Sequence, residues 1–78
     1  MSSINTPVTT EEKWKEAAAS GSGIFSGSRP FQFCYATAQP EDMLIGHRVN
    51  NGSTEKYLLP SGEKLYVKGN FTLVLTAD

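Results

Sequence analysis

The pattern between Lys64 and Asp78 constrains the fold most strongly. Apolar residues alternate with other residues in two runs, Lys64 to Lys68 and Phe71 to Thr76, and Gly69-Asn70 separates them. Such alternation is typical of β-strands with one buried face. Glycine and asparagine both tolerate the positive φ angles that two-residue hairpin turns require. We therefore predict a β-hairpin that turns at Gly69 and Asn70.

Further strand and turn signals precede this segment. Phe31 to Ala38 alternates aromatic and smaller residues and is the clearest single strand, while Ile24-Phe25 and Glu55 to Leu59 are shorter candidates. Turn residues recur at Pro40, at Asn51-Gly52 and at Pro60-Ser61-Gly62. Turns about every eight to twelve residues are typical of small sandwiches and barrels. We predict one mainly β domain over residues 11–78, an antiparallel β-sandwich or barrel.

The N-terminal part gives weaker signals. Residues 1–10 are polar, contain Pro7, and have few apolar side chains, so we predict a flexible arm there. Residues 9–19 combine a capping box, Thr9 with Glu12, with many helix formers, which favours a short helix. Only Trp14, Ala17 and Ala18 would form its apolar stripe, so a strand stays open as the alternative.

The small size of the chain indicates that it needs extra stabilisation. It has 78 residues, one cysteine and one histidine, so neither an internal disulfide nor a structural zinc site is expected, and no cofactor is predicted. Oligomerisation is the remaining means of stabilisation for so small a core. Aromatic residues are enriched at interfaces. The predicted interface residues of a homo-oligomer are Trp14, Phe25, Phe31 and Tyr57.

Charge and hydropathy exclude two classes of partner. The net charge is −1, with seven basic and eight acidic residues, which argues against nucleic acid. The aromatic residues could form a stacking platform for single strands, but without interleaved basic residues a core and subunit interface is favoured. No apolar run has the length of a membrane span, and the N-terminus lacks the features of a signal peptide.

Candidate catalytic residues are few. Cys34 lies within the strand over Phe31 to Ala38, so we interpret it as a small buried side chain. His47 and Arg48 are adjacent and would point to opposite faces of a strand, so a structural or surface histidine is favoured. The glycines between Ser20 and Ser28 lack the order of a phosphate-binding loop. We therefore predict that the protein is not an enzyme.

Several short motifs occur in a recognisable order. They are Trp14, Tyr35 to Pro40, Gly46 to Val49, Pro60 to Gly69 with its Gly-Glu-Lys-Leu-Tyr-Val-Lys strand, and Leu73 to Thr76. This order resembles the small β-rich virion proteins of tailed bacteriophages, over about residues 12 to 76. The resemblance implies that the segment around Trp14 is a strand, although its residues are more helical than the family pattern.

The resemblance implies a structural role in the virion. It favours a capsid decoration, or cement, protein that binds the major capsid protein as a homotrimer, after synthesis in the bacterial host cytoplasm. Alternatives are a tail or fibre adaptor, or a small phage protein that inhibits a host enzyme. An arm that orders on the capsid would supply the contact. Its predicted capsid-binding residues are Ser2, Ser3, Ile4, Asn5, Thr6, Pro7 and Val8.

Overall fold

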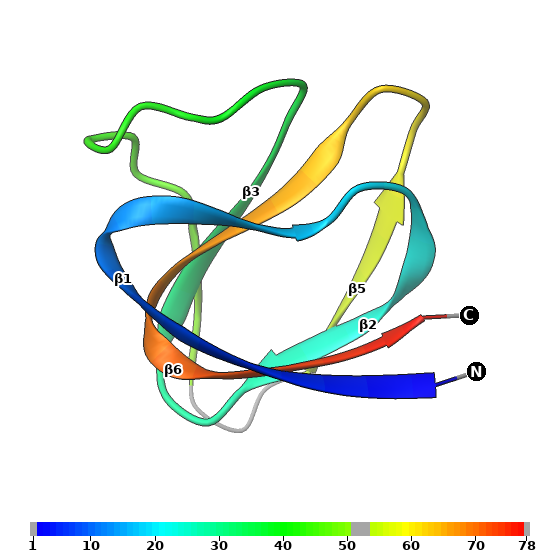
Figure 1. The fold of residues 1–78 in the computed structure, drawn as a ribbon, viewed down its shortest axis with the longest axis horizontal. Helices are drawn as coiled ribbons and strands as arrows, with labels where there is room; N and C mark the ends of the chain where they lie inside the picture. Colours follow the sequence, from blue (N-terminus) through cyan, green and yellow to red (C-terminus); the bar gives the residue numbers. More distant parts are fainter. Residues whose placement is uncertain (1, 51–53, 78) are drawn as a thin grey trace.

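The chain folds into one curled antiparallel sheet of six strands (Figure 1). The computed structural model describes residues 2–50 and 54–77, and it contains no helix within them. This confirms the mainly β prediction, and the curled sheet forms a half-barrel. The strands are β1 (Ser2–Ala18), β2 (Gly21–Gly27), β3 (Phe31–Ala36), β4 (His47–Val49), β5 (Thr54–Leu59) and β6 (Lys64–Ala77).

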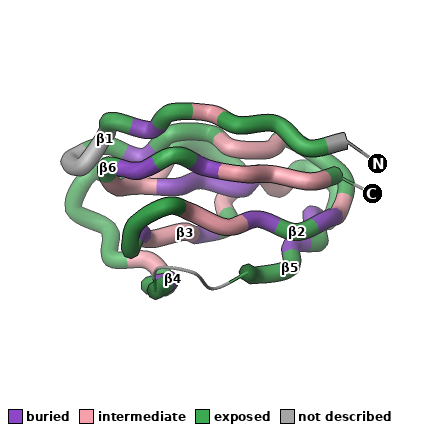
Figure 2. The backbone as a smooth tube through the Cα atoms, turned by 90° about the horizontal axis from the view of Figure 1, so that it is seen from below, coloured by how far each residue is buried: buried purple, intermediate pink, exposed green. Residues whose placement is uncertain are grey.

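The long strand β6 organises the sheet. β1 pairs with one edge of β6 from Ser2–Ala77 to Ala18–Leu65, which places the two ends of the described chain side by side (Figure 1). On the other edge, β3 pairs with the first part of β6 and β2 with the last part. β4 then adds to β3, and β5 adds to β2. Figure 2 shows the resulting succession of strands from β1 to β4 and β5.

The predicted hairpin at Gly69 and Asn70 is wrong. β6 continues through both residues, which pair with Thr10 and Thr9 of β1. On the edge of β6 opposite β1, the first half pairs with β3 and the second half pairs with β2. These longer-range pairings replace the pairing of the two halves with each other that a hairpin would require. Gly69 has a φ of +153°, a conformation that side chains disfavour. Glycine at position 69 therefore allows a bend within β6.

One turn prediction is confirmed and one lies outside the described residues. The amide of Glu63 donates a hydrogen bond to the carbonyl oxygen of Pro60 at 3.0 Å, and Gly62 has a φ of +87°. Positive φ at the third position is the requirement of a type II turn, and this turn joins β5 to β6. The expected turn at Asn51 and Gly52 is not in the part of the chain that the structure describes.

The core fills the concave side of the sheet. Every strand contributes to it, and buried residues, purple in Figure 2, alternate with exposed ones in β2 and β5. In β6, Leu65 to Val67 are buried consecutively, because Tyr66 belongs to a second cluster. Within the main cluster the rings of Phe31 and Phe71 stack with centroids 4.3 Å apart. The buried residues of this cluster are Val8, Phe25, Phe31, Val49, Tyr57, Leu59, Leu65, Val67, Phe71 and Leu73.

The predictions for the N-terminal region need correction. The expected arm, residues 1–10, lies in β1 over its described part, and the Val8 side chain is fully buried. The helix favoured over residues 9–19 is also replaced by β1, so the strand alternative is the right one. Pairing with β6 supplies backbone hydrogen bonds, as a helix would, and also buries Val8 and Trp14, and this burial overrides local helix propensity.

The four predicted interface aromatics are buried in the single chain. Trp14, Phe31 and Tyr57 are each 3% exposed, and Phe25 is 1% exposed. Phe25 packs edge-on against the ring of Phe31 with centroids 6.1 Å apart. A side chain buried in its own core offers no surface to a second copy, so these residues do not form the expected interface. In a domain this small the large aromatic side chains are needed to fill the core.

Candidate functional site

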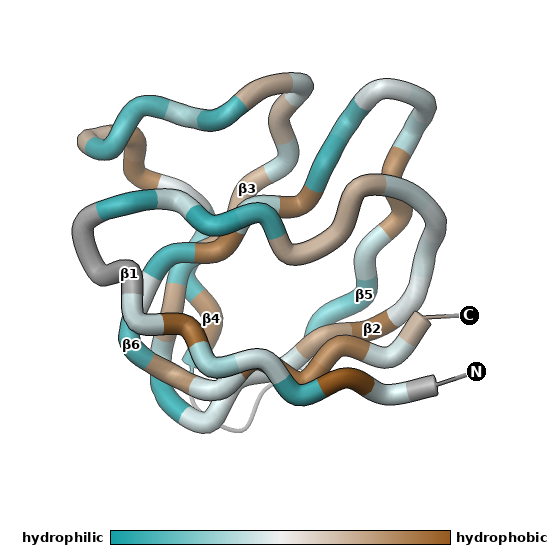
Figure 3. The backbone as a smooth tube through the Cα atoms, viewed as in Figure 1, coloured by the Kyte–Doolittle hydropathy of each residue, from teal (hydrophilic) through white to brown (hydrophobic). Residues whose placement is uncertain are grey.

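Three consecutive exposed apolar side chains, two of them the most exposed large apolar side chains of the described residues, lie in the connection between β3 and β4. Met43 is 90% exposed, Leu44 is 46% exposed and Ile45 is 85% exposed. The hydropathy colouring of Figure 3 shows this apolar stretch directly after a hydrophilic one at the upper left. Single exposed apolar residues are ordinary, but three consecutive ones form a patch of the kind that partners cover. We call Met43, Leu44 and Ile45 the apolar apex.

Polar contacts hold the apolar apex in place. The amide of Leu44 donates to the carbonyl oxygen of Glu41 at 3.0 Å, which closes a turn at the tip. The Nζ of Lys68 donates to the carbonyl oxygen of Asp42, which ties the loop to β6. An ordered loop that exposes apolar side chains has already lost the conformational entropy that docking would otherwise cost.

Two more contacts fix the flanks of this loop. The amide of Gly46 donates to Oε1 of Gln32 in β3 at 3.1 Å. The Nε2 of Gln39 donates to the carbonyl oxygen of Trp14 in β1. The connection is therefore attached to three strands by polar groups, while its apolar side chains remain at the surface.

A second, smaller core lies beneath the loop. Its buried members are Trp14, Cys34 and Tyr66, with Ala36 packed against them. The Nζ of Lys68 lies 5.6 Å from the ring centroid of Trp14, within the range of a cation–π interaction. The buried Nε1 of Trp14 has no hydrogen-bond partner among the described residues, so packing holds the indole in place.

An irregularity in β1 brings Trp14 to this position. Thr10 pairs with Gly69 and Lys15 pairs with Val67, so four residues of β1 lie opposite one residue of β6. Such a bulge redirects side chains from one face of a sheet to the other. Gly46 then allows close approach, because a Cβ there would lie 2.6 Å from Cη2 of Trp14. Trp14 and the glycine together form the support of the loop.

The candidate catalytic residues do not come together. Cys34 is buried in the second core, as predicted for a small buried side chain, and burial raises the pKa of its thiol. A thiol with a raised pKa and little exposure has a low concentration of the reactive thiolate. His47 is exposed on β4, with its ring centroid 5.3 Å from that of Phe33. Among the described residues, no three His, Cys, Asp or Glu side chains form a metal-ligand group.

The predicted capsid-binding residues of the N-terminus lie along β1. The hydroxyl groups of Ser3 and Thr76 are 2.7 Å apart, so this end of β1 contacts β6 through side chains as well as the backbone. Ile4, Asn5 and Pro7 are exposed, but Val8 is buried. The apolar apex was not among the residues predicted from the sequence. The available signal was a run of three apolar residues directly after Pro40-Glu41-Asp42.

Two further findings concern the described chain as a whole. Within residues 2–50 and 54–77 there is no helix of the length and apolar character needed to span a membrane. Comparisons of the chain with protein-family models, with curated proteins and with solved structures found no match.

Proposed function

We propose that the protein is a structural component of a tailed-bacteriophage virion that decorates the head by binding the major capsid protein. The observation that carries the proposal is the ordered apolar apex. The order of motifs along the chain, which resembles small virion proteins, supplies the class of partner. Binding of this kind requires a compact body and a preformed contact surface.

The apolar apex is proposed as the main contact with the capsid. Full burial of Met43 and Ile45 would each contribute about 1.5 to 3 kcal/mol to binding, and Leu44 would contribute about half as much because it is 46% exposed. The loop is already held by hydrogen bonds to β3 and β6, so little ordering energy offsets this gain. This contact replaces the predicted arm, because the described residues of that arm are paired in β1.

A homotrimer is the proposed assembly on the capsid. Repeated copies around a symmetry axis multiply weak contacts, so each apolar apex can bind modestly and the assembly can still bind tightly. The trimer contacts would use exposed residues, since the four aromatics first expected there lie in the core.

The location is tested by quantitative mass spectrometry of purified phage particles that encode the chain. We expect a copy number comparable with that of the major capsid protein. A few copies per particle would instead identify a tail or fibre adaptor. Absence from the particles would contradict a virion role and favour a protein directed at a host enzyme.

The contact is tested with capsids that lack the protein. Ile45→Ser should weaken binding of the purified chain, because it removes an 85% exposed apolar side chain from the apolar apex. Leu58→Ser is the matched control, since Leu58 is 72% exposed but lies in β5. Equal binding of the two variants would contradict the proposed contact.

A further inference from the structure

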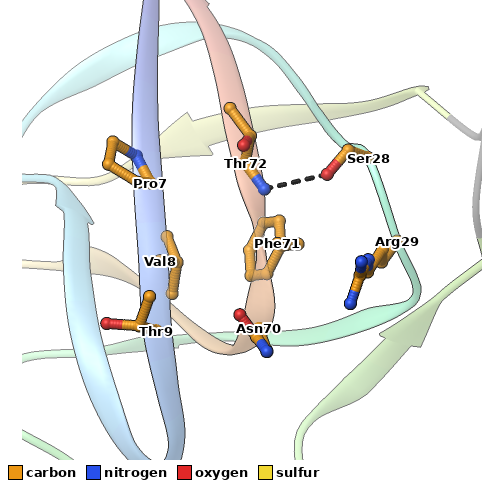
Figure 4. Close-up of a pocket in the computed structure, with 8 residues that line it drawn as sticks. All are labelled: Pro7, Val8, Thr9, Ser28, Arg29, Asn70, Phe71 and Thr72. Atoms are coloured by element: carbon orange, nitrogen blue, oxygen red, sulfur yellow. Dashed lines mark hydrogen bonds between the residues drawn. The ribbon is translucent and has the colours of Figure 1, made fainter.

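An open groove crosses the sheet at the bend of β6. Its volume is 340 Å³, and three segments of the chain form it (Figure 4). β1 supplies one wall, the β2–β3 connection supplies the other, and β6 lies between them. The described residues that line the groove are Pro7, Val8, Thr9, Ser28, Arg29, Asn70, Phe71 and Thr72.

Ser28 builds one wall of the groove where β2 leaves β6. Its amide donates to the carbonyl oxygen of Thr72 at 3.1 Å, and its Oγ accepts from the amide of Thr72 at 2.9 Å. The dashed line in Figure 4 marks the second contact. One serine thus satisfies both main-chain groups of Thr72, and its hydroxyl hydrogen stays available to a ligand. Arg29 follows directly and stands at the rim.

The lining is rich in donors and positively charged. Arg29 is the only charged residue among the described lining residues, and it forms no ion pair with any residue that the structure describes. Ser28 and Thr72 carry hydroxyl groups and Asn70 carries an amide, while the hydroxyl of Thr9 points away from Arg29 in Figure 4. A guanidinium donates up to five hydrogen bonds and accepts none. The matching ligand is an anion that only accepts hydrogen bonds.

We propose that this groove binds a carboxylate group on an extended peptide segment of the protein partner. The two oxygens of a carboxylate match the planar fork of the Arg29 guanidinium, and their remaining lone pairs suit the neighbouring hydroxyls. Because the groove is open, a small free anion would keep most of its hydration, whereas a peptide adds contacts on both sides of its acidic residue. The choice of a peptide rests on the proposed function, which requires a protein partner.

The test is a titration of the full chain, labelled with ¹⁵N, followed by NMR. The probe is a capped peptide with a central Asp-Glu pair flanked by Gly and Ser, and the reference is the same peptide with Asn-Gln. We expect shifts at residues 7–9, 28–29 and 70–72 with the acidic peptide alone. Arg29→Gln should weaken binding about tenfold or more, because a charge-assisted contact is lost.

Arg48→Gln is the matched control, because it removes the same charge from an exposed position in β4. The inference is overturned if the neutral peptide binds equally, if Arg29→Gln leaves binding unchanged, or if Arg48→Gln weakens it as much. Equal binding of a uronic-acid oligosaccharide at the same residues would overturn the choice of a peptide. The titration needs no virion, so its failure is distinct from absence of the protein from particles.

Discussion

At the scale of single residues, glycines decide where the chain can approach itself closely. Gly69 lies at the bend of β6, where a Cβ would lie 3.2 Å from side-chain atoms of both Phe31 and Phe71. Gly62 also has a positive φ, but a Cβ there would meet no atom within 4 Å. The two positions therefore separate the effect of backbone strain from the effect of crowding in the core.

Gly69→Ala should lower the free energy of unfolding by about 2 kcal/mol or more. The alanine would be strained at a φ of +153° and would also displace the stacked pair of phenylalanines. Urea denaturation followed by circular dichroism measures the change.

Gly62→Ala is the control for this substitution and should cost only about 1 kcal/mol, the strain alone. If both variants lost the same stability, the crowding of Phe31 and Phe71 would not contribute.

At the scale of elements, the β3–β4 loop is attached mainly by polar contacts and by one glycine. Of residues 37–46, only Pro40 and Gly46 are partly buried, while the remainder are exposed. The loop therefore depends on its hydrogen bonds to β1, β3 and β6 and on the contact between Gly46 and Trp14. A substitution that displaces the loop should therefore also expose the indole of Trp14.

Gly46→Ala should lift the loop away from Trp14. The added Cβ would lie 2.5 Å from the carbonyl oxygen of Phe33 and 2.6 Å from the indole, distances that real contacts do not sustain. The indole is now 3% exposed, so tryptophan fluorescence should move to longer wavelength and become easier to quench with acrylamide.

Met43→Ser should leave the fluorescence unchanged, because Met43 is 90% exposed at the tip of the same loop. A cooperative thermal transition for Gly46→Ala would show that the sheet remains folded. An unchanged emission spectrum in that variant would contradict the role of Gly46 in covering Trp14.

At the scale of the whole molecule, the single chain is as compact as a complete domain. Its radius of gyration is 11.3 Å, and a folded chain of this length is expected to have about 11.5 Å. Its accessible surface is 4930 Å², close to the roughly 4,700 Å² expected for its mass. Compaction therefore does not require the proposed trimer. The pairing of β1 with β6 does contribute, because it joins the two ends of the chain.

Deletion of residues 2–10 should abolish cooperative folding. The deletion removes the fully buried Val8 and leaves the edge of β6 that faced β1 without a partner from Gly69 to Ala77. A domain of this length has a total stability of about 4 to 12 kcal/mol, so loss of a strand from the core exceeds what it tolerates. Dispersion of amide signals in a ¹H–¹⁵N spectrum provides the measurement.

Val8→Ala in the full chain should lower the free energy of unfolding by about 2 kcal/mol, through loss of buried apolar groups. Asn5→Ala, at an exposed position of the same strand, should have little effect. A well-dispersed spectrum from the truncated chain would restore the view that these residues form an independent arm.

Local sequence determined the class of the fold. Alternation in Phe31 to Ala36 and in the two halves of β6 predicted strands, and the turn at Pro60 to Gly62 was predicted from residue type. These features depend on neighbours in the chain, and so the sequence carries them directly. Burial of Cys34 followed from its place within a strand.

Tertiary structure decided which strands pair and therefore which residues are at the surface. Gly69-Asn70 has the residue types of a turn, but the pairing of β1 along all of β6 made it a bend. The same pairing turned a predicted arm or helix into a strand and placed Trp14 under the β3–β4 loop. Pairings between residues this far apart depend on the free energy of the whole sheet, which no local pattern contains.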